Sequence, residues 1–211
     1  MPTHYGPPPH RGEARLRPAL QNMWDAITDA PAWIHNDRQD LLAPNDLAQV
    51  LYAPLLADPR RPANIARFLY LDPAARDLLP DWDKAANDVA AMLRGEADRN
   101  PYSTDLTNLI GELSTRSEIF RKHWAEHSVR QHRTGPKKIH HPAVGNLELN
   151  FETMSLDSDP SLTLVIYTAV PNSPAPTPSA SWPPGPPLRT SRKPTFTNAS
   201  RKQRWQRTRW T

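Results

Sequence analysis

Cysteine is absent from this chain of 211 residues, and glycine is scarce, with seven residues. Without cysteine there is no disulfide framework, no thiolate metal ligand and no cysteine nucleophile. The glycines form no Gly-x-Gly-x-x-Gly loop for phosphates, and no Gly-x-Ser-x-Gly elbow surrounds a serine. The sequence therefore predicts a protein that is not an enzyme and that needs no cofactor.

Long apolar runs are missing as well. No run approaches the roughly 18 apolar residues of a membrane-spanning helix. The first ten residues contain four prolines and lack the apolar core of a secretory signal. We therefore expect a cytoplasmic protein with no membrane span.

Acidic residues are missing from the last forty positions, which hold eight Lys and Arg and eight Pro. All 22 acidic residues and 18 of the 26 basic residues thus fall within positions 1–171, which gives this part a net charge of −4. A nucleic-acid surface is not expected there. We predict a disordered leader at 1–15, a folded domain at 16–171 and a disordered, basic tail at 172–211. The favoured interpretation is that this tail has no role. The alternative is that it stacks on nucleic-acid bases without sequence preference or binds to an anionic membrane.

Apolar periodicity divides the folded part into strands, then helices, then strands. Leu20, Trp24 and Ile27 share one face of a helix, and residues 31–34 and 40–43 flank a polar turn as in a short hairpin. Helical spacing then continues to position 124. Alternation at 147–151 and the apolar run at 162–167 predict strands, the second of them central. This pattern predicts an α+β fold with a helical insertion between two groups of strands.

Proline, aspartate and glycine predict several helix boundaries. Pro44 suits the first turn of a helix that should end at Pro54. Asp72 and Asp81 have the chemistry of N-caps. Gly95 is placed where a left-handed residue would end the helix that starts near Trp82.

Four segments follow one another in fixed order between positions 68 and 147. They are FLYLDPAARDLLPDW at 68–82, ELSTRS at 112–117, WAEH at 124–127 and HPAVGNL at 141–147. Their order and spacing resemble the MmyB-like ligand-binding domain, the sensor part of bacterial XRE-type helix-turn-helix transcriptional regulators. The resemblance spans about positions 16 to 174.

The resemblance implies a PAS-like antiparallel sheet with helices over one face, enclosing an apolar cavity. It also implies a small hydrophobic or fatty-acid-like ligand. Members of this family carry a DNA-binding domain ahead of the sensor, and about fifteen residues precede the first predicted helix here. We therefore expect a truncated or split regulator.

Aromatic side chains are the first candidates for the lining of such a cavity, although aromatic residues at regular spacing usually form a core. Arg116 is a candidate for binding an anionic head group or, alternatively, Glu112. The predicted ligand-binding residues are Trp33, Phe68, Trp82, Arg116, Phe120, Trp124 and His127.

Histidines and lysines offer two further interpretations. His123 and His127 are spaced for one face of a helix, so both could bind one zinc ion together with His140, His141 or Glu126. A structural role or a helix-capping role is favoured for these histidines, and no metal is predicted. The pair Lys137-Lys138 is interpreted as solvated, with a carboxylate or phosphate group as the alternative partner.

The sequence thus predicts a ligand-sensing domain of a transcriptional regulator. An interaction module that forms homodimers or binds intact regulators without a ligand is the alternative. An open pocket favours the first function, whereas a filled core with an exposed apolar patch favours the second.

Overall fold

The computed structural model describes residues 18–126 and 133–170. These residues form one five-stranded antiparallel sheet with the strand order β2-β1-β5-β4-β3. The strands are β1 (Ala32–Asn36), β2 (Leu41–Pro44), β3 (Thr134–His141), β4 (Gly145–Leu156) and β5 (Asp159–Ala169). The predicted hairpin is confirmed, and β5 is the central strand, as its apolar sequence predicted.

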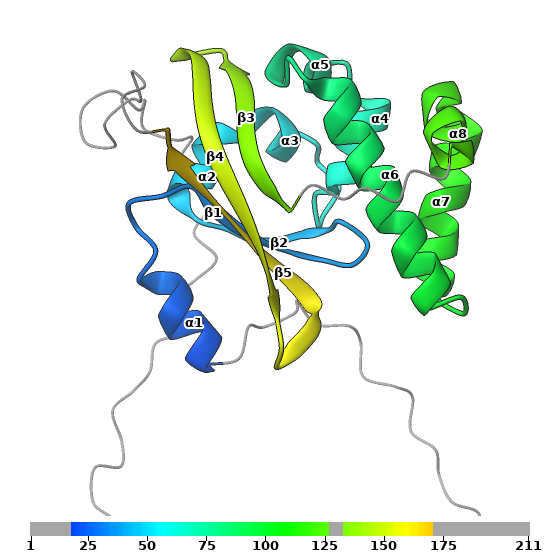
Figure 1. The fold of residues 1–211 in the computed structure, drawn as a ribbon, viewed down its shortest axis with the longest axis horizontal. Coiled ribbons are helices and arrows are strands. Elements are labelled where there is room, and N and C mark those ends of the chain that lie inside the picture. The colour runs from blue at the N-terminus through cyan, green and yellow to red at the C-terminus, as the bar shows by residue number, and fades with distance from the viewer. Residues whose placement is uncertain (1–17, 127–132, 171–211) are drawn as a thin grey trace, which may run out of the picture.

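A helical segment separates the two groups of strands (Figure 1). Its helices are α2 (Asp46–Leu51), α3 (Ala53–Leu56), α4 (Ile65–Leu71), α5 (Ala74–Leu78), α6 (Trp82–Arg99), α7 (Thr104–Arg116) and α8 (Glu118–Ala125). The α+β fold with a PAS-like sheet and an inserted helical layer is therefore confirmed. Among the described helices none is both long and apolar enough to cross a bilayer.

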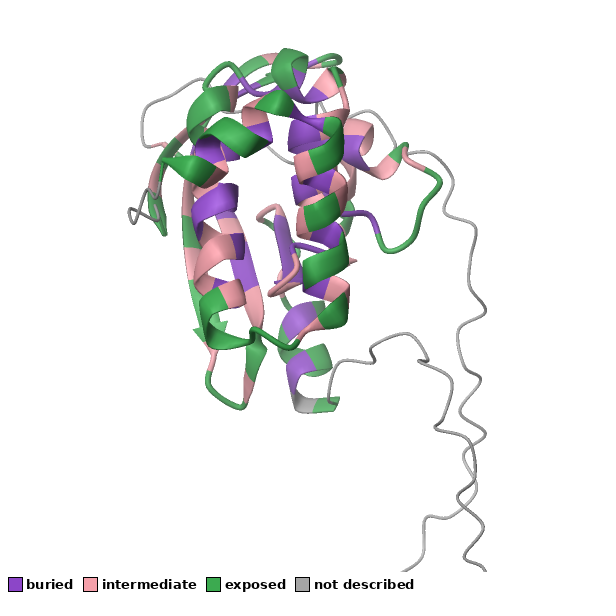
Figure 2. Ribbon diagram, turned by 90° about the vertical axis from the view of Figure 1, so that its right-hand side faces the viewer, coloured by how far each residue is buried: buried purple, intermediate pink, exposed green. Residues whose placement is uncertain are grey.

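The sheet is covered on both faces, which explains why β5 is apolar on both sides. The inner face contributes Val165 and Tyr167 to the main core shared with helices α2–α8. On the outer face, Leu164 packs with Leu20 and Trp24 of α1 (Pro18–Asp25). Figure 2 shows buried residues where helices and strands face one another and exposed residues on the outside.

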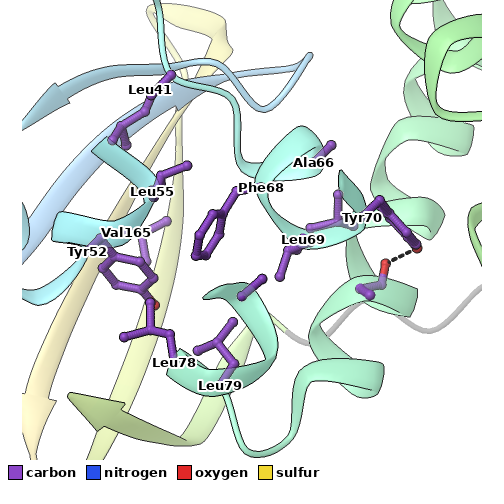
Figure 3. Packing of buried hydrophobic residues seen from close by; sticks show 14 of the residues in the cluster. Leu41, Tyr52, Leu55, Ala66, Phe68, Leu69, Tyr70, Leu78, Leu79 and Val165 are labelled. Atoms are coloured by element: carbon purple, nitrogen blue, oxygen red, sulfur yellow. Dashed lines mark hydrogen bonds between the residues drawn. The ribbon is translucent and has the colours of Figure 1, made fainter. Parts of the chain in front are cut away.

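The side chains of one short helix, α4, divide between two parts of the core (Figure 3). Phe68 points toward Tyr52, Leu55 and Val165, near the sheet. Tyr70 points the other way, and its hydroxyl donates a hydrogen bond of 2.6 Å to the carbonyl of Ala86 in α6. This helix therefore joins the sheet to the outer helices.

Three predicted boundaries are wrong. Pro44 ends β2, and Asn45 caps α2 by accepting from the amide of Ala48. Pro54 lies in the first turn of α3, where its missing N–H costs nothing, so it does not end a helix. Gly95 does not end α6, which continues to Arg99 because tertiary packing outweighs the cost of one glycine.

The two aspartate caps differ from each other. Pro73, and not Asp72, occupies the N-cap position of α5, but the carboxylate of Asp72 one residue earlier accepts from the amide of Ala74, as a capping carboxylate should. Asp81 occupies the N-cap position of α6 but makes no capping hydrogen bond through its side chain. Both aspartates thus mark helix starts, although only Asp72 satisfies an end amide.

Candidate functional site

The inner face of the sheet changes from apolar to polar along its strands. In β1, Trp33 is followed on the same face by His35. Val165 of β5 lies beside Trp33, and Thr163 lies beside His35. In β4, Ser155 is paired with Thr163. One end of this face therefore contributes to the core, and the other presents hydrogen-bonding groups.

A wide hollow of about 700 Å³ lies between this polar end and the C-terminal half of α6. Its volume is in the range of sites for small molecules, about 300–1,000 Å³. Most of its lining side chains are polar or charged. They are His35, Asp37, Gln39, Met92, Glu96, Arg99, Asn100, Arg133, Thr153, Ser155, Pro160, Ser161 and Thr163.

A narrow hollow of about 40 Å³ lies at the other end of α6, between this helix and strands β3 and β4. Lys84, Lys137 and Lys138 line it together with Asp81, Asp88 and apolar groups. The ammonium of Lys137 lies 5.7 Å from the centre of the Phe151 ring. Burial lowers the pKa of Lys137 to about 8, although the nearby carboxylate of Asp88 opposes this shift.

Burial shifts the pKa of two ionisable groups in the wide hollow away from the ordinary values. Burial lowers the pKa of His35 below its ordinary value, despite a hydrogen bond between its ring and the carbonyl of Asn36. Burial, together with the charge of Glu96, raises the pKa of Asp37, and Arg99 partly offsets this. Glu96 is buried and accepts a hydrogen bond of 2.8 Å from Arg99.

Three aromatic residues form the core beside the wide hollow. The ring of Trp33 lies edge-on to Tyr52, with 4.3 Å between the centroids, and 5.2 Å from the ring of Tyr167. The indole Nε1 of Trp33 is buried, and it has no hydrogen-bond partner in the part of the chain that the structure describes. Such an unsatisfied donor costs about 1–3 kcal/mol, so it marks a position where an acceptor would be stabilising.

Three of the predicted aromatic residues lie elsewhere, in the helical layer. Phe120 stacks on Trp124, with 5.4 Å between the centroids, and also meets Tyr70 edge-on. Trp82 donates to the carbonyl of Leu69. None of these three aromatic residues lines the wide or the narrow hollow. Their assignment to ligand binding stays a prediction, separate from the site described above.

Phe68 and Arg116 both line a third hollow, of about 70 Å³. The guanidinium of Arg116 donates to Glu112 over 2.9 Å, which is the alternative partner that the sequence left open. Glu112 also accepts from Arg67 at 2.8 Å and from Arg60 at 3.4 Å. This carboxylate therefore joins arginines from three segments of the chain.

The histidines engage different partners. His123 is buried, with Nδ1 3.0 Å from the hydroxyl of Tyr70 and Nε2 3.3 Å from a carboxylate oxygen of Asp83. Nε2 of His141 bonds to the carbonyl of Val50, and His140 bonds to Asn146. His127 lies outside the described residues. Within those residues no three His, Asp or Glu side chains are grouped as a metal site would require.

The polar lining of the wide hollow was not predicted from the sequence. Thr153 and Ser155 continue the alternation that begins at Leu147 in β4, so their shared face was open to prediction. Their position opposite α6 was not, because Thr153 and Ser155 follow the last residue of that helix, Arg99, by more than fifty positions in the chain.

A family model for the MmyB-like transcription regulator ligand binding domain matches residues 16–178. This match includes β1 to β5 and all helices that line the wide hollow. No curated protein matches the chain significantly.

Proposed function

We propose, since the chain belongs to the MmyB-like transcription regulator ligand binding domain family, that it senses a small molecule in the wide hollow between α6 and the inner face of the sheet. The family is a class of regulatory ligand-binding domains and not a class of enzymes. In this proposal the chain has no catalytic role, and its output is the control of transcription.

The wide hollow is the observation that carries the proposal. Its volume of about 700 Å³ suits a small ligand. It is formed by three strands and one helix, so a bound molecule contacts both layers of the fold. If the distance between the sheet and α6 differs between two conformers, a ligand that binds one conformer more tightly shifts the population toward it. The size of this shift is set by the difference between the affinities of the two conformers for the ligand.

The proposed ligand is a hydrophobic or amphipathic molecule, with fatty-acid-like compounds among the candidates. Its polar part would occupy the wide hollow. Its apolar part would lie along the sheet toward Trp33 and Val165, which follow the polar residues on the inner face.

Two measurements on the full chain, produced in bacteria, test this function. They are native mass spectrometry and organic extraction of the purified protein. We expect a bound small molecule of defined mass. In a Ser161→Trp variant, the indole would fill part of the hollow and reduce occupancy. Thr168→Trp is the matched control, because Thr168 is exposed and lies outside the hollow on the same strand.

Folded protein that carries no small molecule and takes up no added amphiphile would contradict the proposal. If such protein is a dimer by the same measurement, the alternative of an interaction module gains support. Equal ligand loss in both tryptophan variants would place the ligand elsewhere in the domain.

A further inference from the structure

We propose that the wide hollow selects an uncharged, hydroxylated head group and disfavours a carboxylate. This inference rests on the proposed function, because it specifies the ligand class of the same site. It follows from the hydrogen-bonding groups and the fixed charges that line the hollow.

The ring of His35 supplies a hydrogen-bond acceptor. Nδ1 lies 2.9 Å from the carbonyl of Asn36, and a carbonyl only accepts, so Nδ1 carries the proton. In the neutral ring Nε2 then has a lone pair, and burial favours this neutral form. A ligand hydroxyl can donate to Nε2, whereas a carboxylate has no proton to donate.

The carboxylates of Asp37 and Glu96 add further acceptors and negative charge. These two groups are close enough that the charge of Glu96 raises the pKa of Asp37. Arg99, whose charge acts on Asp37 in the opposite direction, already donates to Glu96 through Nε at 3.1 Å and Nη2 at 2.8 Å. A ligand carboxylate would therefore meet repulsion that a hydroxyl group does not meet.

Cationic and hydroxyl groups complete the lining. Arg133 and Asn100 provide donors, and the hydroxyls of Ser155 and Thr163 can both donate and accept. A carboxylate only accepts, so it can use the donors of this lining but not the acceptors of His35, Asp37 and Glu96. An uncharged head with several hydroxyl groups can bond to both kinds of group.

Two other hollows are lined by cations and are competing places for an anionic head group. One, of about 420 Å³, is lined by Arg38, Arg60, Arg61 and Arg67, three of which already form ion pairs with Asp40, Asp105, Asp58 and Glu112. The other is the narrow hollow, which is lined by three lysines and has a volume of only about 40 Å³, so a sugar-sized head does not fit there. The proposal therefore assigns the hydroxylated head group to the wide hollow.

Two amphiphiles with the same eight-carbon chain test the inference: octyl glucoside below its micelle concentration, and sodium octanoate. Isothermal titration calorimetry with the full chain at neutral pH should show octyl glucoside binding at least about tenfold more tightly, the effect of one additional hydrogen bond to a charged group. Asp37→Asn should improve octanoate binding and narrow this ratio, because it removes the repelling charge.

Matched variants separate the effect of a charge or hydroxyl group in the hollow from the effect of the same substitution elsewhere on the protein. Asp98→Asn removes the same charge from an exposed position of α6 outside the lining and should leave the ratio unchanged. Thr163→Val should weaken octyl glucoside binding several-fold with little effect on octanoate. Thr168→Val, on the opposite face of β5, should change neither affinity.

The outcomes distinguish the inference from the function on which it depends. If neither amphiphile binds, both are overturned. If octanoate binds as tightly as octyl glucoside or more tightly, sensing in this domain is retained and the head-group inference is overturned. Loss of that octanoate binding in Lys137→Gln would then locate the head group in the narrow hollow.

Discussion

The hydroxyl groups of Tyr52 and Tyr167 lie 2.9 Å apart in the core and join the end of α2 to the central strand β5. These residues are 115 positions apart in the chain. Burial raises the pKa of both phenols, so both remain protonated and one donates to the other. A polar pair thus fixes the position of the helical layer on the sheet.

Replacement of Tyr167 by Phe should lower the free energy of unfolding by about 1–2 kcal/mol, because the buried hydroxyl of Tyr52 loses the hydroxyl of Tyr167 as its hydrogen-bond partner. Tyr52→Phe should have a similar effect. In the double variant the cost should be smaller than the sum of the two, since no hydroxyl is left unpaired. Urea unfolding measures these differences, and strictly additive losses would contradict a direct bond.

Stability should fall as the pH is lowered through 6.5, the ordinary pKa of histidine, because His35 has a lower pKa in the folded protein. Below 6.5 the unfolded chain binds a proton at this position and the folded protein does not. The loss amounts to up to about 1.4 kcal/mol for each pH unit between the two pKa values. It is absent above 6.5 and complete below the folded pKa.

Denaturant midpoints of the wild type and of His35→Gln, measured across this pH range, test the assignment. The variant should show a shallower pH dependence. His140→Gln is the control, because His140 is exposed. Equal slopes for wild type and His35→Gln would show that another group titrates.

Glu112→Gln should destabilise the protein by about 1–2 kcal/mol, because this carboxylate accepts hydrogen bonds from arginines of three segments. Burial acts to raise the pKa of Glu112, but Arg67, Arg116 and Arg60 outweigh it and leave the pKa below its ordinary value. Its contribution is thus present at neutral pH and is lost in acid. Arg116→Ala should cost less than about 1 kcal/mol, since that ion pair is exposed. Thermal unfolding compares the two variants, and a larger loss for Arg116→Ala would contradict this ranking.

Gly111→Ala should stabilise the protein by about 0.8–1.0 kcal/mol, the cost of a glycine inside a helix. Gly111 lies within α7, and an added Cβ meets no atom within 4 Å. Gly145→Ala is the contrasting variant. Its φ of +78° lies in the left-handed region, so alanine should destabilise by about 1–2 kcal/mol although the space is open. Changes of the same sign in both variants would contradict this reasoning.

Much of the fold was open to prediction because each element shows its periodicity locally. Leu106, Leu109 and Leu113 repeat with helical spacing, and all three are buried in the core. The errors at Pro54 and Gly95 have different causes. Pro54 lies in the first turn of α3, where proline costs nothing, whereas at Gly95 the packing of α6 outweighs the roughly 1 kcal/mol cost of one glycine.

The candidate site was less predictable. Aromatic residues were predicted to line a cavity because large apolar side chains can be identified from the sequence alone. Among them, Trp33 lies next to the wide hollow, since its neighbour on the same face of β1 is His35. His35, Asp37 and Thr163 gave no such signal. A single polar residue at the end of a strand has the same local sequence features whether it faces solvent or a hollow.

The sequence by itself determined the order of strands and helices and the family, through apolar periodicity and four motifs that need no tertiary contact to be recognised. Tertiary structure decided which of these side chains meet. It placed Thr163 and His35 opposite the C-terminal half of α6, and it put Trp82, Phe120 and Trp124 in the helical layer outside the lining of the wide hollow. The physical reason is that periodicity reports the face on which a residue lies, whereas a binding site depends on distances between faces that packing alone sets.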